Sequence, residues 1–360
     1  MTLSSRIKER GINALIIALV FLAAGIYSCA AQAQSAMNAN YTEHPITLAK
    51  NAGNAIHLDP NAILDANAVA LNRAINSPYA ELKPSLTPDG NRLYFSRVFH
   101  PENTSGQNDN EDIWYTERDK VSNVWSEPVR MMGVLNNTGP NFINNVSMTG
   151  DTIILGNQYL KKGKMRAGLS YSVNLNGQWT APTPIHIQGD YNMSAHANSF
   201  VSLKSGVIIS AIERAETYGD RDLYVSFWNG SVATEPINMG SVINTDVEES
   251  SPYLASDNKT LYFASKGHAG YGGYDIYVTT RLDDSWTNWS EPRNLGPAVN
   301  GALNDEFFSI SHCGQYAVFS KQVSVHNTDL FKISTEELFL NVGNKKDKKS
   351  QQDASSLASL

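Results

Sequence analysis

Acidic residues stand at matching positions in three segments of this sequence, each at the start of a strand-like run. Glu81 and Glu249 each precede a proline by three residues, and Asp305 has the same position in a third segment. Asn141 and His196 fall close to that position in two further segments. Carboxylates gathered in a ring could coordinate a cation, dock a basic peptide or, as a pair, hydrolyse a glycosidic bond. We therefore treat these five residues as a candidate binding ring and assign no catalytic residue.

The same residues also have a structural interpretation, which we favour. Buried polar side chains are usually hydrogen-bonded within the fold, and these residues would then serve to join repeated units. Hydrogen bonds that occupy Glu81, Glu249 and Asp305 would support this role. Two carboxyl groups at a glycosidase spacing in an open pocket would instead support hydrolysis.

Two other residue types recur at fixed positions. An aspartate begins the same short apolar stretch four times, at Asp112, Asp222, Asp275 and Asp329. A tryptophan recurs three times, at Trp125, Trp179 and Trp289. A catalytic group is needed once, so we predict that the aspartates accept hydrogen bonds from amides of the preceding loops. The tryptophans are predicted to be packing anchors between units.

The sequence gives little sign of a cofactor. Its two cysteines, Cys29 and Cys313, are too few for a disulfide framework or a thiolate metal site. The acidic loop at residues 109–112 could bind Ca²⁺, but it lacks the spacing of a calcium-binding loop. The glycine-rich residues 266–273 join two strand-like runs, whereas a phosphate-binding loop must begin a helix. We expect neither a cofactor nor a bound metal.

A repeat positions all these residues. Trp125 and Trp179 are 54 residues apart, and Asp222 and Asp275 are 53 apart. Each period contains short runs of β-branched and aromatic residues separated by Gly, Asn, Asp and Pro, which is typical of consecutive antiparallel strands. A period of this length with four strands and no helix predicts an all-β fold, a five-bladed β-propeller of four-stranded antiparallel blades.

The blade boundaries follow from the same repeat. We predict a propeller over residues 71–340, with blades at 81–137, 141–190, 194–246, 249–300 and 304–335. The fifth blade lacks its outer strand, and residues 71–76 resemble that strand, so we expect the N-terminal segment to close the ring. Six blades are the alternative. First strands of blades surround a central channel, so the candidate ring is expected to line it.

Both ends of the chain are expected to lie outside the propeller. Residues 1–35 have a basic start, an apolar stretch and small residues, as in an export signal. The stretch before Cys29 is similar to a bacterial lipobox, which predicts lipidation there and a place on the periplasmic face of the outer membrane. The alternative is ordinary cleavage and a soluble periplasmic or secreted protein. Residues 36–70 are predicted to form a linker and short N-terminal segment, and residues 341–360 a disordered tail.

The net charge of −7 and the pI near 5.6 argue against nucleic-acid binding through bulk electrostatics, which needs clustered Lys and Arg. The only membrane contact that we expect is through the possible lipid anchor at Cys29. The sequence leaves the oligomeric state open.

Two stretches resemble a known repeat. Residues 84–96 follow the pattern Pro-x-Leu-x-Pro-Asp-Gly-x-x-Leu-Tyr-Phe-Ser, and residues 261–277 repeat its later part. They resemble the WD40-like (PD40) propeller repeat of the TolB type, as found before OmpA-like domains of envelope proteins. The resemblance covers about residues 71–335, but this chain ends after the propeller, so it implies no peptidoglycan anchoring. It implies a non-enzymatic binding or scaffold protein with an envelope protein or peptide as partner. A glycoside hydrolase that uses channel-rim carboxylates is the alternative.

Overall fold

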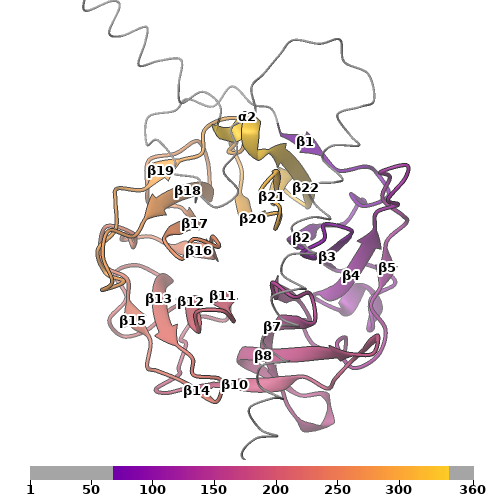
Figure 1. Cartoon of the computed structure of the whole chain (residues 1–360), viewed down its shortest axis with the longest axis horizontal. Helices are drawn as coiled ribbons and strands as arrows, with labels where there is room; N and C mark the ends of the chain where they lie inside the picture. Colours follow the sequence, from indigo (N-terminus) through magenta and orange to yellow (C-terminus); the bar gives the residue numbers. More distant parts are fainter. Residues whose placement is uncertain (1–67, 340–360) are drawn as a thin grey trace, which may run out of the picture. The chain divides into compact units, whose positions relative to one another are not determined.

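The computed structural model describes residues 68–339, which form five small antiparallel sheets around a common centre (Figure 1). The predicted export signal, Cys29, most of the linker and the tail lie outside the described residues. The five-bladed β-propeller is confirmed. No helix within the described range is both long and apolar enough to cross a bilayer.

The blades follow one another along the chain. Blade 1 contains β2 (Glu81–Leu86), β3 (Arg92–Arg97), β4 (Asp112–Glu117) and β5 (Val129–Arg130). Blade 2 contains β6 (Ile143–Val146), β7 (Thr152–Tyr159), β8 (Met165–Leu175), β9 (Gln178–Trp179) and β10 (Thr183–Ile187). Blade 3 contains β11 (Asn198–Ser202), β12 (Val207–Ile212), β13 (Asp222–Phe227) and β15 (Ile237–Asn238), and β14 (Val232–Ala233), in its loop between β13 and β15, joins the sheet of blade 2.

The last two blades complete the ring. Blade 4 contains β16 (Glu249–Leu254), β17 (Thr260–Ser265), β18 (Asp275–Thr280) and β19 (Arg293–Asn294). Blade 5 contains β20 (Asp305–Ile310), β21 (Tyr316–Ser324), β22 (Asn327–Ser334) and β1 (Val69–Ala70). Short helical segments follow strands at η1 (Gly106–Asn108), η2 (Lys161–Gly163) and α2 (Thr335–Phe339).

The strands alternate with tight turns whose chemistry is visible in the sequence. In the β2–β3 turn the Gly90 N–H donates to the Thr87 carbonyl at 2.8 Å, and Gly90 has a φ of +67°. Glycine adopts this angle without steric penalty, which explains the Asp-Gly pair at this turn. The second strands β12 and β17 are buried along their whole length because neighbouring blades cover both of their faces.

The repeated tryptophans pack where neighbouring blades meet. Trp289 is 3% exposed and belongs to an apolar cluster with residues of blade 3. Trp125 packs against a cluster that contains Leu330 of blade 5, and Trp179 packs against one that contains Ile113 of blade 1. Burial of these large rings between blades is the anchoring role expected for them.

The N-terminal segment closes the ring slightly earlier than expected. Val69 lies opposite Lys332 in an antiparallel pair between β1 and β22, so the closing strand precedes the predicted residues 71–76. The Leu71 N–H still donates to the Leu330 carbonyl at 2.9 Å, after which the chain turns away into blade 1. With both ends joined in one sheet, blade 5 has no unpaired outer edge at β22.

Candidate functional site

The first strands of the five blades, β2, β6, β11, β16 and β20, surround the centre of the ring (Figure 1). Four of them, all except β11, carry a β-bulge, where the register shifts by one residue, and in β2, β16 and β20 a residue at the bulge has a positive φ. At the bulges Lys83, Ser251 and Phe307 have φ values of 56°, 49° and 56°. Non-glycine residues rarely adopt this left-handed conformation, so the bulge turns three side chains in a direction that a regular strand would not give.

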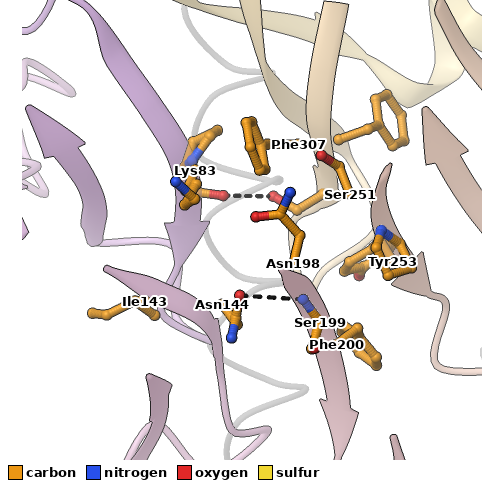
Figure 2. A pocket seen from close by; sticks show the side chains of 13 residues that line it. Lys83, Ile143, Asn144, Asn198, Ser199, Phe200, Ser251, Tyr253 and Phe307 are labelled. Atoms are coloured by element: carbon orange, nitrogen blue, oxygen red, sulfur yellow. Dashed lines mark hydrogen bonds between the residues drawn. The ribbon is translucent and has the colours of Figure 1, made fainter. Parts of the chain in front are cut away.

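These bulges shape the central channel. Figure 2 shows Lys83, Asn198, Ser251 and Phe307 converging on one space from different blades. The cavity they line, together with Asn144 and other first-strand residues, has a volume of about 30 Å³. That space holds roughly one or two water molecules. The channel centre is therefore filled by side chains and is too small for a sugar ring.

The predicted ring lies elsewhere. Glu81, Asn141, Glu249 and Asp305 are each at most 1% exposed and do not line this cavity. This corrects the expectation that they line the channel. The three acids begin first strands, and Asn141 lies two residues before β6. Their side chains are held by the connections between blades, and the residues that line the channel follow two positions later. We call Glu81, Glu249 and Asp305 the carboxylate ring.

Glu249 is bonded on both oxygens. Its Oε2 accepts from the Thr245 N–H at 2.8 Å, and its Oε1 accepts from the hydroxyls of Thr245 and Ser265 at 2.8 and 2.7 Å. Burial, with a smaller contribution from the charge of Asp222, raises the pKa of Glu249 to about 7 despite the lowering effect of these hydrogen bonds.

Glu81 and Asp305 repeat this arrangement with an added cation. Glu81 accepts from the Ser77 N–H at 3.1 Å and pairs with the Arg97 guanidinium at 3.1 Å. Asp305 accepts from the Gly301 N–H at 2.6 Å and pairs with Lys321 at 2.9 Å. Burial raises the pKa of Glu81 to about 7 and that of Asp305 to about 6. In all three cases the backbone N–H lies four residues before the acid.

Asn141 takes the acid's place between blades 1 and 2. Its Oδ1 accepts from the Asn137 N–H at 2.7 Å, and its Nδ2 donates to the Tyr159 hydroxyl at 3.0 Å. His196 does not join the ring, because it is exposed and lies one residue before the corresponding position, which Ala197 occupies. The prediction for His196 is thereby corrected.

The repeated aspartates lie next to the carboxylate ring. Oδ2 of Asp112 accepts from the Thr104 N–H at 2.7 Å, Oδ2 of Asp222 accepts from the Tyr218 N–H at 2.9 Å, and Asp275 bonds the Tyr271 N–H. Each is thus bonded to an amide of the preceding loop. Their Oδ1 atoms are buried without a hydrogen-bond partner among the described residues. Asp329 differs, because its Oδ1 accepts a hydrogen bond from the side-chain amide of Asn327 at 3.0 Å.

One asparagine completes each of four junctions, and these four residues were not predicted from the sequence. Each lies five residues before a ring position and uses its side-chain amide to pair with the backbone of the preceding blade's third strand: Asn76, Asn136, Asn244 and Asn300. Asn244, for example, accepts from the Leu223 N–H at 2.8 Å and donates to the Leu223 carbonyl at 3.0 Å. The signal was an apolar residue followed by Asn and, five residues on, Glu, Asp or Asn. We call an aspartate, asparagine and ring residue at one junction a blade clamp.

The arrangement favours structural over hydrolytic chemistry. A glycosidase needs one carboxylic acid and one carboxylate facing a common substrate pocket. The carboxylate ring is instead buried and bonded inside the clamps. The acidic loop residue Glu111 is also engaged, in an ion pair of 2.5 Å with Lys83. No group of three or more His, Cys, Asp or Glu residues in the described part of the chain is arranged to hold a metal ion.

Exposed apolar side chains mark a different surface. The first strands begin at one face of the propeller, which also carries the loops between second and third strands and the connections between blades. We call it the long-loop face. Each blade places at least one large exposed apolar side chain in its loop between second and third strands: Phe99, Leu160, Tyr218, Tyr271 and Val325. Such side chains gathered on one face are typical of a protein-binding surface.

Comparisons with known proteins establish no family for this chain. No family model and no curated protein matches it. Among solved structures, TolB from Acinetobacter baumannii aligns at 12% identity over 72% of this chain and 56% of that chain, with a TM-score of 0.41. The chain therefore spans just over half the length of that relative.

Two other solved structures are similar to the same extent. An α-L-arabinofuranosidase from Lactobacillus brevis aligns at 12% identity over 73% of this chain and 94% of that chain, with a TM-score of 0.45. A protein of unknown function from Dyadobacter fermentans aligns at 12% identity over 77% and 99%, with a TM-score of 0.47. At this level of similarity the neighbours leave the function open.

Proposed function

We propose that this protein is a non-enzymatic binding protein of the bacterial cell envelope, which holds a protein or peptide partner on its long-loop face. The observation that carries the proposal is the presence of exposed apolar side chains in the corresponding loop of every blade. Tyr218 and Tyr271 are 55% and 53% exposed, and aromatic residues are enriched at interface centres. The rigid ring beneath them holds the loops in fixed positions, as suits a preorganised binding surface.

The hydrogen bonds of the carboxylate ring support this function over glycoside hydrolysis. A general acid or nucleophile must reach the substrate, and Glu81, Glu249 and Asp305 are buried in contacts with the protein itself. The small channel cavity supports the same choice, because a sugar does not fit between Lys83 and Phe307.

The test compares two faces of the propeller in envelope extract. The long-loop variant carries Tyr218→Ser, Tyr271→Ser and Val325→Ser. The control variant carries Val121→Ser, Leu175→Ser and Leu282→Ser, which are exposed in loops or at a strand end on the opposite face. Each protein is crosslinked in extract, and the captured proteins are quantified by mass spectrometry.

We expect a defined partner to be enriched with the wild type and the control variant, and lost with the folded long-loop variant. Equal capture by all three proteins, or loss only in the control variant, would refute the assignment of the long-loop face. Circular dichroism and thermal unfolding establish that each variant is folded.

The envelope location rests on the export signal and on Cys29, which we propose is lipidated. Labelling of cells with a radioactive fatty acid compares the wild type with Cys29→Ser. Label in the wild type alone is expected, whereas equal label in both would end the lipid-anchor proposal.

A further inference from the structure

The junction between blades 2 and 3 is the one place in the described ring where the blade clamp is missing. Gly168 stands at the position of the repeated aspartate, and Ala197 stands at the ring position. Asn192 precedes Ala197 by five residues, as clamp asparagines do, but its Oδ1 accepts from the Glu213 N–H of its own blade at 2.9 Å. A repeat that loses its stabilising contacts at one junction is a candidate for a functional site.

An open cleft lies on the blade 2 side of this junction, beside the connection to blade 3. It has a volume of about 480 Å³ and is lined mainly by polar side chains, among them Gln158, Arg166, His186, Asp190 and Tyr191. This volume lies within the range of small-ligand sites. The outer rim is also distinctive, because β10 of blade 2 pairs in parallel with β14 of blade 3, with His186 opposite Val232. This strand pair joins the outer edges of blades 2 and 3, and the cleft itself remains open.

Tyr191 is held as a rigid platform in this cleft. Its ring lies 4.1 Å from the Arg214 guanidinium, and its hydroxyl accepts from the Ala215 N–H at 3.1 Å and contacts Glu216 at 3.2 Å. Arg214 is itself fixed by Glu216 at 2.6 Å and by the Gly189 carbonyl at 3.0 Å. The tyrosine nevertheless remains 41% exposed. A flat ring with its hydroxyl fixed and much of its surface open can stack against a ligand with little loss of side-chain entropy.

The polar groups around this platform keep hydrogen-bonding capacity, although Asp190 lies within the electrostatic influence of Arg166, Arg214 and His186. No hydrogen bond between described residues occupies the Asp190 carboxylate or the His186 imidazole. Arg166 donates to Gln158 Oε1 at 2.5 Å and keeps its other N–H groups available. The cleft therefore offers acceptors and donors side by side, with charges of both signs.

We propose that this cleft binds a carbohydrate, with the apolar face of a pyranose stacked on Tyr191 and its hydroxyls bonded to Asp190, His186 and Arg166. Neighbouring hydroxyls both donate and accept, so they match a carboxylate beside cationic donors. The carbohydrate site is separate from the proposed protein-binding face. A negative result with sugars would therefore leave the protein-binding proposal intact.

The experiment uses saturation-transfer NMR on the full chain with three neutral trisaccharides, maltotriose, cellotriose and chitotriose, at millimolar concentration. Acetate and phosphate serve as small-anion probes. The variants are Tyr191→Ala, which removes the platform, and Tyr191→Phe, which keeps the ring. Leu282→Ala is the control, an exposed apolar side chain of blade 4 on the face opposite the long loops.

We expect at least one trisaccharide to bind the wild type, with affinity reduced at least about tenfold in Tyr191→Ala, a loss of about 1.4 kcal/mol. Tyr191→Phe and Leu282→Ala should bind within a factor of about three of the wild type. A similar fall in trisaccharide affinity in Asp190→Asn would support the contact between the Asp190 carboxylate and the sugar hydroxyls. Absence of transfer to all three sugars, equal binding by Tyr191→Ala, or binding of acetate or phosphate alone would overturn the proposal.

Discussion

Asn76 and Leu330 are 254 residues apart in the chain and are joined by two hydrogen bonds. The Asn76 Nδ2 donates to the Leu330 carbonyl at 3.1 Å, and its Oδ1 accepts from the Leu330 N–H at 2.8 Å. One side-chain amide thus continues a strand pair across the junction between the first and last blades. The same side-chain amide contact recurs at three other junctions, so ring closure and the packing of neighbouring blades use the same hydrogen-bond arrangement.

Replacing Asn76 tests how much this device contributes to closure. Asn76→Ala removes both bonds to Leu330 and a third to the Leu71 carbonyl. The Leu330 carbonyl keeps the Leu71 N–H, but the Leu330 N–H loses its acceptor, so we expect the free energy of unfolding to fall by about 2–3 kcal/mol. Asn229→Ala is the control, because Asn229 bonds only within an exposed turn. Denaturant unfolding measures both. A loss in Asn76→Ala no greater than in the control would contradict the closure role.

The carboxylate ring predicts an unusual dependence of stability on pH. Burial raises the pKa of Glu249 from 4.5 to about 7, so the folded state binds this proton more tightly than the unfolded state. Its contribution to stability is complete below pH 4.5 and is lost as the pH rises through about 7. The free energy of unfolding that is lost in this way is on the order of 3 kcal/mol.

Glu249→Gln isolates this effect. The variant should lose less stability than the wild type between pH 5 and pH 8 and should be the more stable protein at pH 8, because its neutral amide carries no buried charge. Urea unfolding across this range gives the comparison. Parallel pH profiles for the two proteins would show that Glu249 does not titrate in this window.

Lys83 and Glu111 form a largely buried pair beside the channel, with their charged atoms 2.5 Å apart. Lys83→Met should destabilise the protein by about 3 kcal/mol because it leaves the Glu111 carboxylate without its cation. Adding Glu111→Gln should recover much of that loss, which gives a coupling energy of at least about 1 kcal/mol in a double-mutant cycle. Strictly additive effects in denaturant unfolding would argue against the pair.

Blade 2 offers a test of the broken repeat. Gly168→Asp restores the repeated aspartate in the sequence, but Gly168 has a φ of +140°, and a Cβ there would lie 2.9 Å from the Gln158 side chain. We expect a loss of about 2 kcal/mol rather than a gain, because the backbone and the close contact both oppose a side chain. Ala167→Asp, at an exposed neighbouring position, should change stability by less than about 0.5 kcal/mol. Thermal unfolding that shows Gly168→Asp to be stabilised would mean that the glycine is not required.

The fold could be predicted because the repeat encodes it locally. Turn sequences such as the one ending at Gly90 and the apolar runs that follow them recur often enough to define five blades. Closure by the N-terminal segment also followed, since an open fifth blade would leave an exposed edge. The pairing of Val69 with Lys332 could not be predicted, because a strand of two residues is too short to show an alternating pattern of apolar and polar residues.

The candidate site was harder to predict. Glu81, Glu249 and Asp305 were placed correctly at the start of first strands, but a β-bulge two residues later turns Lys83 and its counterparts into the channel instead. A bulge changes which side chains share a face, and the alternation rule does not show it. His196 was misplaced by one residue because blade 3 lacks the proline that marks the register in blades 1 and 4. The cleft at Tyr191 depends on contacts between two blades, which no local pattern contains.

Whether the carboxylate ring is structural or catalytic is tested most directly by removing all three charges. The triple variant Glu81→Gln, Glu249→Gln and Asp305→Asn is compared with the wild type for hydrolysis of chromogenic arabinosides and xylosides, and for crosslinked partners in envelope extract. We predict a folded variant with the partner capture of the wild type, and no glycoside hydrolysis by either protein. Hydrolysis by the wild type that disappears in the folded triple variant would contradict the account.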